Sequence, residues 1–336
     1  MKSRAVVSCI CLFLFRAEAP PESEGQSGGT AGQPPAVFTG AKYLIVSARD
    51  QCDPAHAVQP GLVVTWTGAC KDKLPDGAGT ITLADRSNTH RMTMHALFVH
   101  GVAEGPQSIT FPDGNVFDGV FHQDQPNGHG RMRYADGSVL EGEFRNDLLE
   151  GTAHTVDAAG TVTDASYRNG QLDGPWAMLY TGGFRVDGVY RAGKRNGPWT
   201  VTFADVSRLT FVYADDTVQT EAAYVTTAGQ RVEGAFLPPR PAPGEMHQVH
   251  HGRGAHLHDA ISAMSVMAAI ASDGHVASLA LTRSSGIKDL DAEVLADIAT
   301  WTFLPATVGG QPVPSLQTVR GRVGDAGLVF DEALEK

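Results

Sequence analysis

The sequence predicts a mainly β protein, in which an elongated antiparallel sheet of β-hairpin repeats is followed by a small α+β domain of ββαβ order. The first observation is a column of aromatic residues spaced 23 apart, at Phe98, Phe121, Phe144, Tyr167 and Tyr190. The second is a column of glycines seven residues after each aromatic, at Gly105, Gly128, Gly151, Gly174 and Gly197. The third is a Pro-rich break, after which the hydrophobic period changes from strand-like to helical.

Composition limits the classes of partner. The chain has 336 residues, of which 42% are hydrophobic and 19% charged, with a formal net charge of −11. These values are typical of a globular protein large enough for two domains. The negative charge excludes the basic surface on which nucleic-acid binding depends, and it disfavours an anionic membrane surface.

Residues 1–19 have the features of a secretory signal peptide. Lys2 and Arg4 precede an apolar run from Ala5 to Phe15, and Ala17-Glu18-Ala19 fits a cleavage site. Pro20 would follow the cut and disfavours it, so a retained tether is the alternative, although eleven apolar residues are too few to span a bilayer. No other segment is predicted to cross a membrane. Residues 20–36 are rich in Pro, Gly and Ser and are predicted to be a disordered leader.

Residues 37–236 are predicted to form the repeats. Each unit alternates apolar and polar residues up to the aromatic, as in "VLEGEF" (139–144), crosses a polar turn and alternates again, which is typical of a β-hairpin. One hairpin cannot bury its own aromatic side chain, so neighbouring hairpins are expected to stack into one sheet. We expect Phe121, Phe144, Tyr167 and Tyr190 to face its interior, and Arg145 to face solvent.

The units resemble the MORN repeat, with the match clearest in "FDGVFHQDQPNGHG". "VTWTGACKDKLPDGAG" (64–79) resembles a capping repeat with Cys70 in the aromatic position, and Thr220 replaces the glycine of the last unit. The resemblance implies a scaffold fold. Outside the signal segment the only cysteines are Cys52 and Cys70, and in an exported protein they are expected to form a disulfide.

Residues 237–255 are predicted to be a Pro- and His-rich linker, stiff over "LPPRPAPG". Histidine is the commonest transition-metal ligand, so the cluster in and just after this linker is a weak metal-site candidate. Its members are His247, His250, His251, His256 and His258. A solvated polar segment is the simpler interpretation, because nothing regular would hold several ligands in place.

Residues 256–323 are predicted to form the α+β domain. Two strand-like runs, 265–272 and 275–283, flank an Asp273-Gly274 turn, and "DLDAEVLADIATW" then places Leu290, Val294, Leu295, Ile298 and Trp301 on one helical face. A final strand is expected at 314–323, and 324–336 as a tail. The segments "DGHV", "SSG", "WTFLPA" and "GGQPV" resemble the C-terminal domain of TonB, in which Trp301 and Phe303 would fix the helix to the sheet.

The TonB resemblance implies protein binding. The chain lacks the transmembrane helix and long charged-Pro spacer of TonB itself, so energy transduction is not implied. We expect an unpaired edge on the last strand to capture an extended peptide, for example from an outer-membrane transporter, by strand addition. The residues expected to form this edge are Gln317, Thr318, Val319, Arg320 and Arg322.

No catalytic or cofactor motif was found, so neither enzymatic activity nor a cofactor is expected. The predicted function is that of a periplasmic or cell-envelope adaptor in a Gram-negative-type bacterium, with homodimers among its expected states. Two alternatives remain: a self-assembling structural scaffold without a transport role, and a metal-handling accessory protein.

Overall fold

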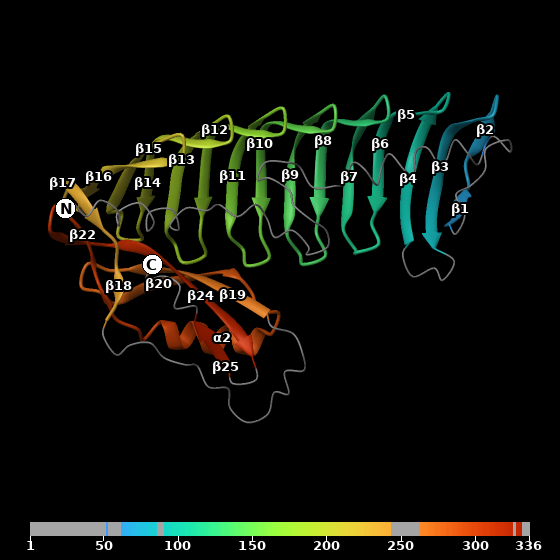
Figure 1. Cartoon of the computed structure of the whole chain (residues 1–336). Helices are drawn as coiled ribbons and strands as arrows, with labels where there is room; N and C mark the ends of the chain where they lie inside the picture. The colour runs from blue at the N-terminus through green and yellow to red at the C-terminus, as the bar shows by residue number, and fades with distance from the viewer. Residues whose placement is uncertain (1–51, 53–61, 86–90, 243–261, 325–326, 331–336) are drawn as a thin grey trace, which may run out of the picture. The chain divides into compact units, whose positions relative to one another are not determined.

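The computed structural model describes Cys52 and residues 62–85, 91–242, 262–324 and 327–330 (Figure 1). The predicted signal peptide (1–19), the leader (20–36) and all five linker histidines lie outside these residues. The described chain is mainly β, with a long antiparallel sheet and a small C-terminal domain that contains a helix, so the predicted fold class is confirmed.

The described residues fall into two compact units. The first unit comprises the described residues up to Ala158 together with Thr163–Gly174, and the second comprises Ala159–Val162 and the described residues from Pro175 onward. The second unit therefore contains both the last repeats and the α+β domain. The expected domain boundary at residues 237–255 does not coincide with this division.

The first unit consists of antiparallel hairpins that follow one another in chain order (Figure 1). Its strands are β1 (Leu62–Trp66), β2 (Ala69–Lys71), β3 (Leu74–Asp85), β4 (Arg91–Val99), β5 (Val102–Ala103), β6 (Gly105–Thr110), β7 (Val116–His122), β8 (Gln125–Arg133), β9 (Val139–Arg145), β10 (Leu148–Val156) and β11 (Val162–Arg168). Strand β12 (Gln171–Leu179) lies across the division between the units, and so does the first residue of β11, Val162, which belongs to the second unit.

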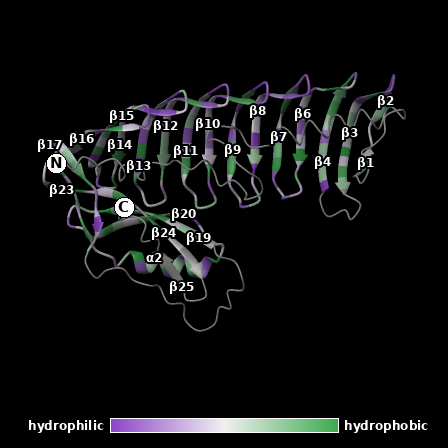
Figure 2. Ribbon diagram, in the orientation of Figure 1, coloured by the Kyte–Doolittle hydropathy of each residue, from purple (hydrophilic) through white to green (hydrophobic). Residues whose placement is uncertain are grey.

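Alternate side chains of these strands are buried. In β9, Leu140, Gly142 and Phe144 are buried, whereas Glu143 and Arg145 are exposed. Figure 2 shows hydrophobic and hydrophilic residues interspersed along the strands in this way. Phe121 and Phe144 are buried as expected, and the Phe117 ring packs edge-on against both, at centroid distances of 6.2 and 5.6 Å.

Tyr167 is only partly buried, and desolvation raises the pKa of its phenol. Tyr167 packs against the buried core of the first unit, so it faces the interior as expected. In the second unit, Tyr190 is buried as expected and packs edge-on against Trp199, with ring centroids 5.2 Å apart.

Two kinds of turn join the repeat strands. Between β7 and β8, Gln123 and Asp124 both have positive φ (50° and 69°), as a type I′ hairpin turn requires. Between β8 and β9, the amide of Gly137 (φ 94°) donates to the Tyr134 carbonyl at 3.0 Å. Asn146-Asp147 repeats the first turn, and Gly160 has positive φ at the position of the second.

The glycine column marks an irregularity in each hairpin. The register between β9 and β10 shifts between Leu149 and Ala153, and Gly151 lies inside the shift with φ 80°. Gly128 has φ 117° at the equivalent place in β8. Positive φ is easily adopted only by glycine, so the column is required by these bulges.

Backbone groups and side chains connect successive hairpins of the first unit at their turns. The amide of Asp147 donates to the Pro126 carbonyl at 3.1 Å, and that of Gly170 donates to the Leu149 carbonyl at 2.9 Å. The Gln123 amide donates to Glu104 Oε1 at 3.1 Å, and this bond lowers the pKa of the Glu104 carboxyl. Each repeat therefore depends on its neighbour for hydrogen bonding as well as for packing.

The second unit continues the repeats with β13 (Arg185–Arg191), β14 (Lys194–Thr202), β15 (Arg208–Ala214), β16 (Thr217–Val225) and β17 (Arg231–Leu237). Residues Arg240–Pro241 form a short strand, β18, that pairs with β21 (Phe303–Leu304). Part of the segment expected to be a linker is therefore held by the α+β domain.

The α+β domain contains a second sheet, of strand order β20-β19-β24-β25. Its elements are β19 (Ser262–Ile270), β20 (Val276–Arg283), α2 (Lys288–Ile298), β24 (Ser315–Gly324) and β25 (Gly327–Phe330). Leu290, Val294 and Ile298 of α2 are fully buried in a cluster with β19 residues, Trp301 and Phe303. The prediction that Trp301 and Phe303 fix the helix to the sheet is confirmed.

The "ATVGGQPV" segment forms the hairpin β22 (Ala306–Val308) and β23 (Gln311–Val313). This hairpin pairs with the last repeat strand and not with the sheet of its own domain: Phe236 lies opposite Val308, and Leu237 opposite Thr307. The prediction that Gly309-Gly310 turns the chain is correct, but the chain turns to form an additional hairpin before β24 begins.

Candidate functional site

The candidate site is the edge of β24 that faces away from β19, which β25 covers only in part. β24 pairs with β19 along Ser315–Val323 and with β25 at Gly321–Gly324. The expectation that β24 is the outermost strand is therefore wrong, because a further strand covers its end and Arg322 lies opposite Val329. Among the described strands, only β19 pairs with Ser315–Arg320, which include Gln317, Thr318, Val319 and Arg320.

β25 lies within the residues expected to be a tail. Its segment "GLVF" follows Gly324 after two intervening residues, and the apolar run Leu328, Val329, Phe330 is itself strand-like. A short loop between Gly-flanked apolar runs is a hairpin signal that could have predicted this strand.

The pairing register indicates which backbone groups face the edge. Gly324 lies opposite Gly327 with two residues between them, and such a loop closes with a hydrogen-bonded pair. Bonded positions alternate along antiparallel strands, so the amide and carbonyl of Arg320 and Thr318 point away from β19. Those of Val319 point toward β19.

A side chain of the same strand already forms a hydrogen bond with one of these backbone groups. The amide nitrogen Nε2 of Gln317 donates to the carbonyl oxygen of Thr318 at 3.1 Å. This bond satisfies an acceptor that would otherwise have no partner strand, and an incoming strand would have to displace it.

Access to the strand at the other edge of this sheet is restricted. A β-carbon added at Gly182, in the turn between β12 and β13, would lie 2.9 Å from the carbonyl oxygen of Leu279 in β20. Backbone atoms of the second unit thus lie against β20 at this point, so the open part of β24 is the better candidate for strand addition.

Polar contacts hold the turn and the helix of this domain in place. Ser284 and Ser285 donate their hydroxyls to the buried Asp291 carboxylate, at 2.5 and 2.6 Å, and thereby position the start of α2. At the other end of the helix, Trp301 Nε1 donates to Asp297 Oδ2 at 3.0 Å. In the β19–β20 turn, the amide of His275 donates to Asp273 Oδ1 at 3.1 Å, which lowers the pKa of the Asp273 carboxyl.

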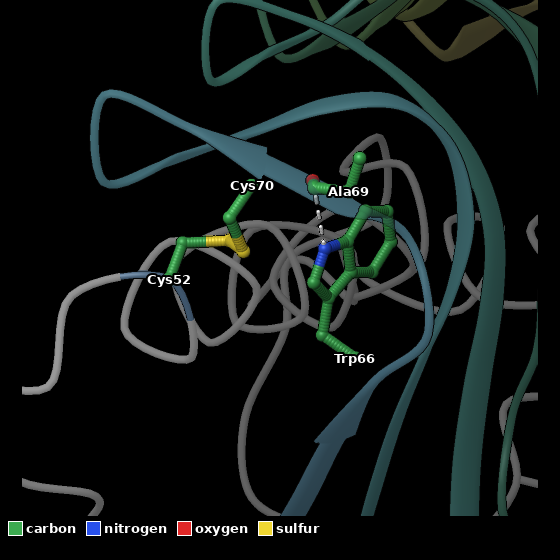
Figure 3. Close-up of a disulfide and its surroundings, with 4 residues drawn as sticks. All are labelled: Cys52, Trp66, Ala69 and Cys70. Carbon is green, nitrogen blue, oxygen red and sulfur yellow. Dashed lines mark hydrogen bonds between the residues drawn. A yellow bond between two sulfur atoms is a disulfide. The ribbon is translucent and has the colours of Figure 1, made fainter.

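The predicted disulfide is present. Cys52 and Cys70 are bonded, with their Cα atoms 5.5 Å apart (Figure 3). Cys70 lies in β2, next to Ala69, whose carbonyl accepts a hydrogen bond from the indole of Trp66 at 3.3 Å. The disulfide therefore attaches Cys52 to the first hairpin of the repeats.

The other site predictions concern metals and membranes. In the described part of the chain, no three His, Cys, Asp or Glu side chains are arranged around a point where they could hold a metal ion. This part of the chain also contains no helix that is both long enough and apolar enough to cross a membrane. The histidine cluster, being outside the described residues, is not tested by either observation.

Comparison with known families agrees with both resemblances. Residues 263–320 match the family model described as Gram-negative bacterial TonB protein C-terminal. Residues 117–139 and 141–161, which correspond to β7–β8 and β9–β10 with the turns that follow them, match the MORN repeat. No curated protein matches the chain. The two matched families point to an envelope-associated role in protein binding.

Proposed function

We propose that this protein is a non-enzymatic adaptor of the periplasm or cell envelope. Its α+β domain captures an extended segment of a partner protein, for example of an outer-membrane transporter, by strand addition to residues 316–320 of β24. The repeats serve as the scaffold that carries this domain.

The observation that carries the proposal is the incomplete pairing of β24. β25 pairs with only four of its residues, whereas β19 pairs with nine. The edge groups of Thr318 and Arg320 therefore have the direction that an added antiparallel or parallel strand requires.

The α+β domain can present this edge rigidly. Leu316 and Val319 are buried, and Val319 belongs to the core formed with α2 and β19. A strand anchored in this way is already in the bound conformation, so binding orders only the peptide.

The test is binding of an extended peptide to the full chain. A ten-residue peptide is first selected from a displayed library against the wild-type protein, then labelled and titrated by fluorescence anisotropy. Thr318→Pro removes the outward amide, and we expect it to weaken binding about tenfold or more while the far-ultraviolet spectrum stays unchanged.

The matched control is Thr318→Val, which keeps the amide and should retain the affinity. Gln317→Ala removes the side chain that donates to the Thr318 carbonyl, so it should strengthen binding. Wild-type affinity in a folded Thr318→Pro protein would exclude strand addition at this edge.

A further inference from the structure

The β24–β25 hairpin leads directly to the edge that the proposed function assigns to the partner. Its register runs without a shift as far as Gly321, which lies opposite Phe330. Because the two strands are antiparallel, each residue that follows Phe330 in the sequence moves one position along β24, toward Ser315. Residues 331–336, "DEALEK", therefore meet this edge if the register continues. The β24 residues opposite them are then, in order, Arg320, Val319, Thr318, Gln317, Leu316 and Ser315.

The same alternation of hydrogen bonds fixes how this segment would pair. Counting from the bonded pair Gly324 and Gly327, Thr318 and Ala333 form another bonded pair. The amide and carbonyl of Ala333 then point toward β24, whereas those of Glu332 point away from it. The edge groups of Thr318 that suit a partner strand therefore suit residues 331–336 equally well.

The composition of the segment makes this pairing weak. Gly327–Phe330 is an apolar run with strand-forming residues, whereas Asp, Glu, Ala and Lys, which make up most of residues 331–336, are depleted in strands. Pairing beyond Phe330 should consequently be less stable than the β24–β25 pairing that precedes it. A weakly paired strand is one that a better strand-forming peptide can displace.

We propose that residues 331–336 are an autoinhibitory strand, which continues β25 along β24 and competes with the partner peptide for the edge groups of Thr318. This inference rests on the proposed function, because it names what regulates access to the same edge. The segment is joined to β25, so its pairing is intramolecular and independent of protein concentration. A partner binds only the molecules in which the segment is displaced, and its apparent affinity is reduced by that fraction.

The hydrogen bond from Gln317 makes displacement less costly. When the segment leaves, the Thr318 carbonyl loses the amide of Ala333 as its donor. Gln317 Nε2 then takes this place, at 3.1 Å from the Thr318 oxygen. The open form of the edge thus keeps this acceptor satisfied, so both forms are accessible to one chain.

The first experiment measures hydrogen exchange at single residues of the full chain without peptide. The Thr318 amide should exchange slowly in the wild-type protein, and about tenfold or more faster in a variant that lacks residues 331–336. The Val319 amide, which points toward β19, is the internal control and should be slow in both proteins.

The second experiment titrates the selected peptide against the same proteins. Removal of residues 331–336 should strengthen binding about three- to tenfold, because the edge is then always accessible. Ala333→Pro removes an amide that points toward β24 and should strengthen binding similarly. Glu332→Pro is the matched control: its amide points away from β24, so the affinity should stay at the wild-type value.

The outcomes separate this inference from the proposed function. Equal exchange of the Thr318 amide with and without residues 331–336 overturns the autoinhibitory strand, whether or not the peptide binds. Protection of Thr318 that disappears on dilution also overturns it, because the edge is then covered by a second copy of the chain. The proposed function fails independently, if folded Thr318→Pro protein binds the peptide as the wild type does.

Discussion

At the scale of single residues, backbone conformation decides which side chains the repeat turns accept. Gly137, Gly160, Gly183 and Gly229 occupy the same turn position with φ between 80° and 94°. Val206 occupies this position in the turn between β14 and β15, with φ 64° and 68% of its surface exposed. A β-branched residue is strained in this region, and the exposed side chain has little packing to offset the strain.

We therefore predict that Val206→Gly stabilises the second unit by about 1 kcal/mol, measured by denaturant unfolding. Val206→Ala keeps a β-carbon and should gain much less. Since glycine also increases the entropy of the unfolded chain, a net loss of stability in Val206→Gly would show that the strain at this turn is negligible.

At the scale of elements, the strand register separates core positions from solvent positions one residue apart. Phe144 is 6% exposed and its ring packs edge-on against that of Phe117, whereas the next residue, Arg145, is exposed. Gly130 leaves room for these rings, because a β-carbon there would lie 2.7 Å from the Phe144 ring and 2.9 Å from Phe117. Aromatic and glycine positions are thus coupled across neighbouring strands.

Phe144→Ala should destabilise the first unit by about 3 kcal/mol or more, because it leaves a cavity among the aromatic rings. Arg145→Ala, the matched control on the other face, should change the stability very little. Thermal unfolding followed by circular dichroism compares the two, and equal shifts in the melting temperature would contradict the observed register.

At the scale of the whole molecule, the α+β domain completes the end of the repeat sheet. The β22–β23 hairpin pairs with β17, and Val308 and Val313 are fully buried. Pro312 lies in β23, the outer strand of the hairpin, where a missing amide limits further strand addition. The hairpin therefore protects the last repeat strand from pairing with other chains.

Val308→Asp places a charge in this buried position, and we expect it to release the hairpin from β17. Hydrogen exchange should then become faster in β17 but stay slow in β19, whose core does not depend on the hairpin. Gln311→Asp, at an exposed position of β23, serves as the control. Unchanged exchange in β17 of the Val308→Asp protein would show that the pairing contributes no protection.

Local structure could be predicted from the sequence alone: the hairpin period, the glycine positions, and the helix that buries Leu290 and Val294. These features depend on residues close together in the chain, where periodicity and turn chemistry act directly. Pairing between distant segments could not be predicted in this way and became visible only in the folded chain. The fold joins β22 to β17 and places β25 beside β24, because strand partners are chosen by burial and hydrogen bonding across the whole fold.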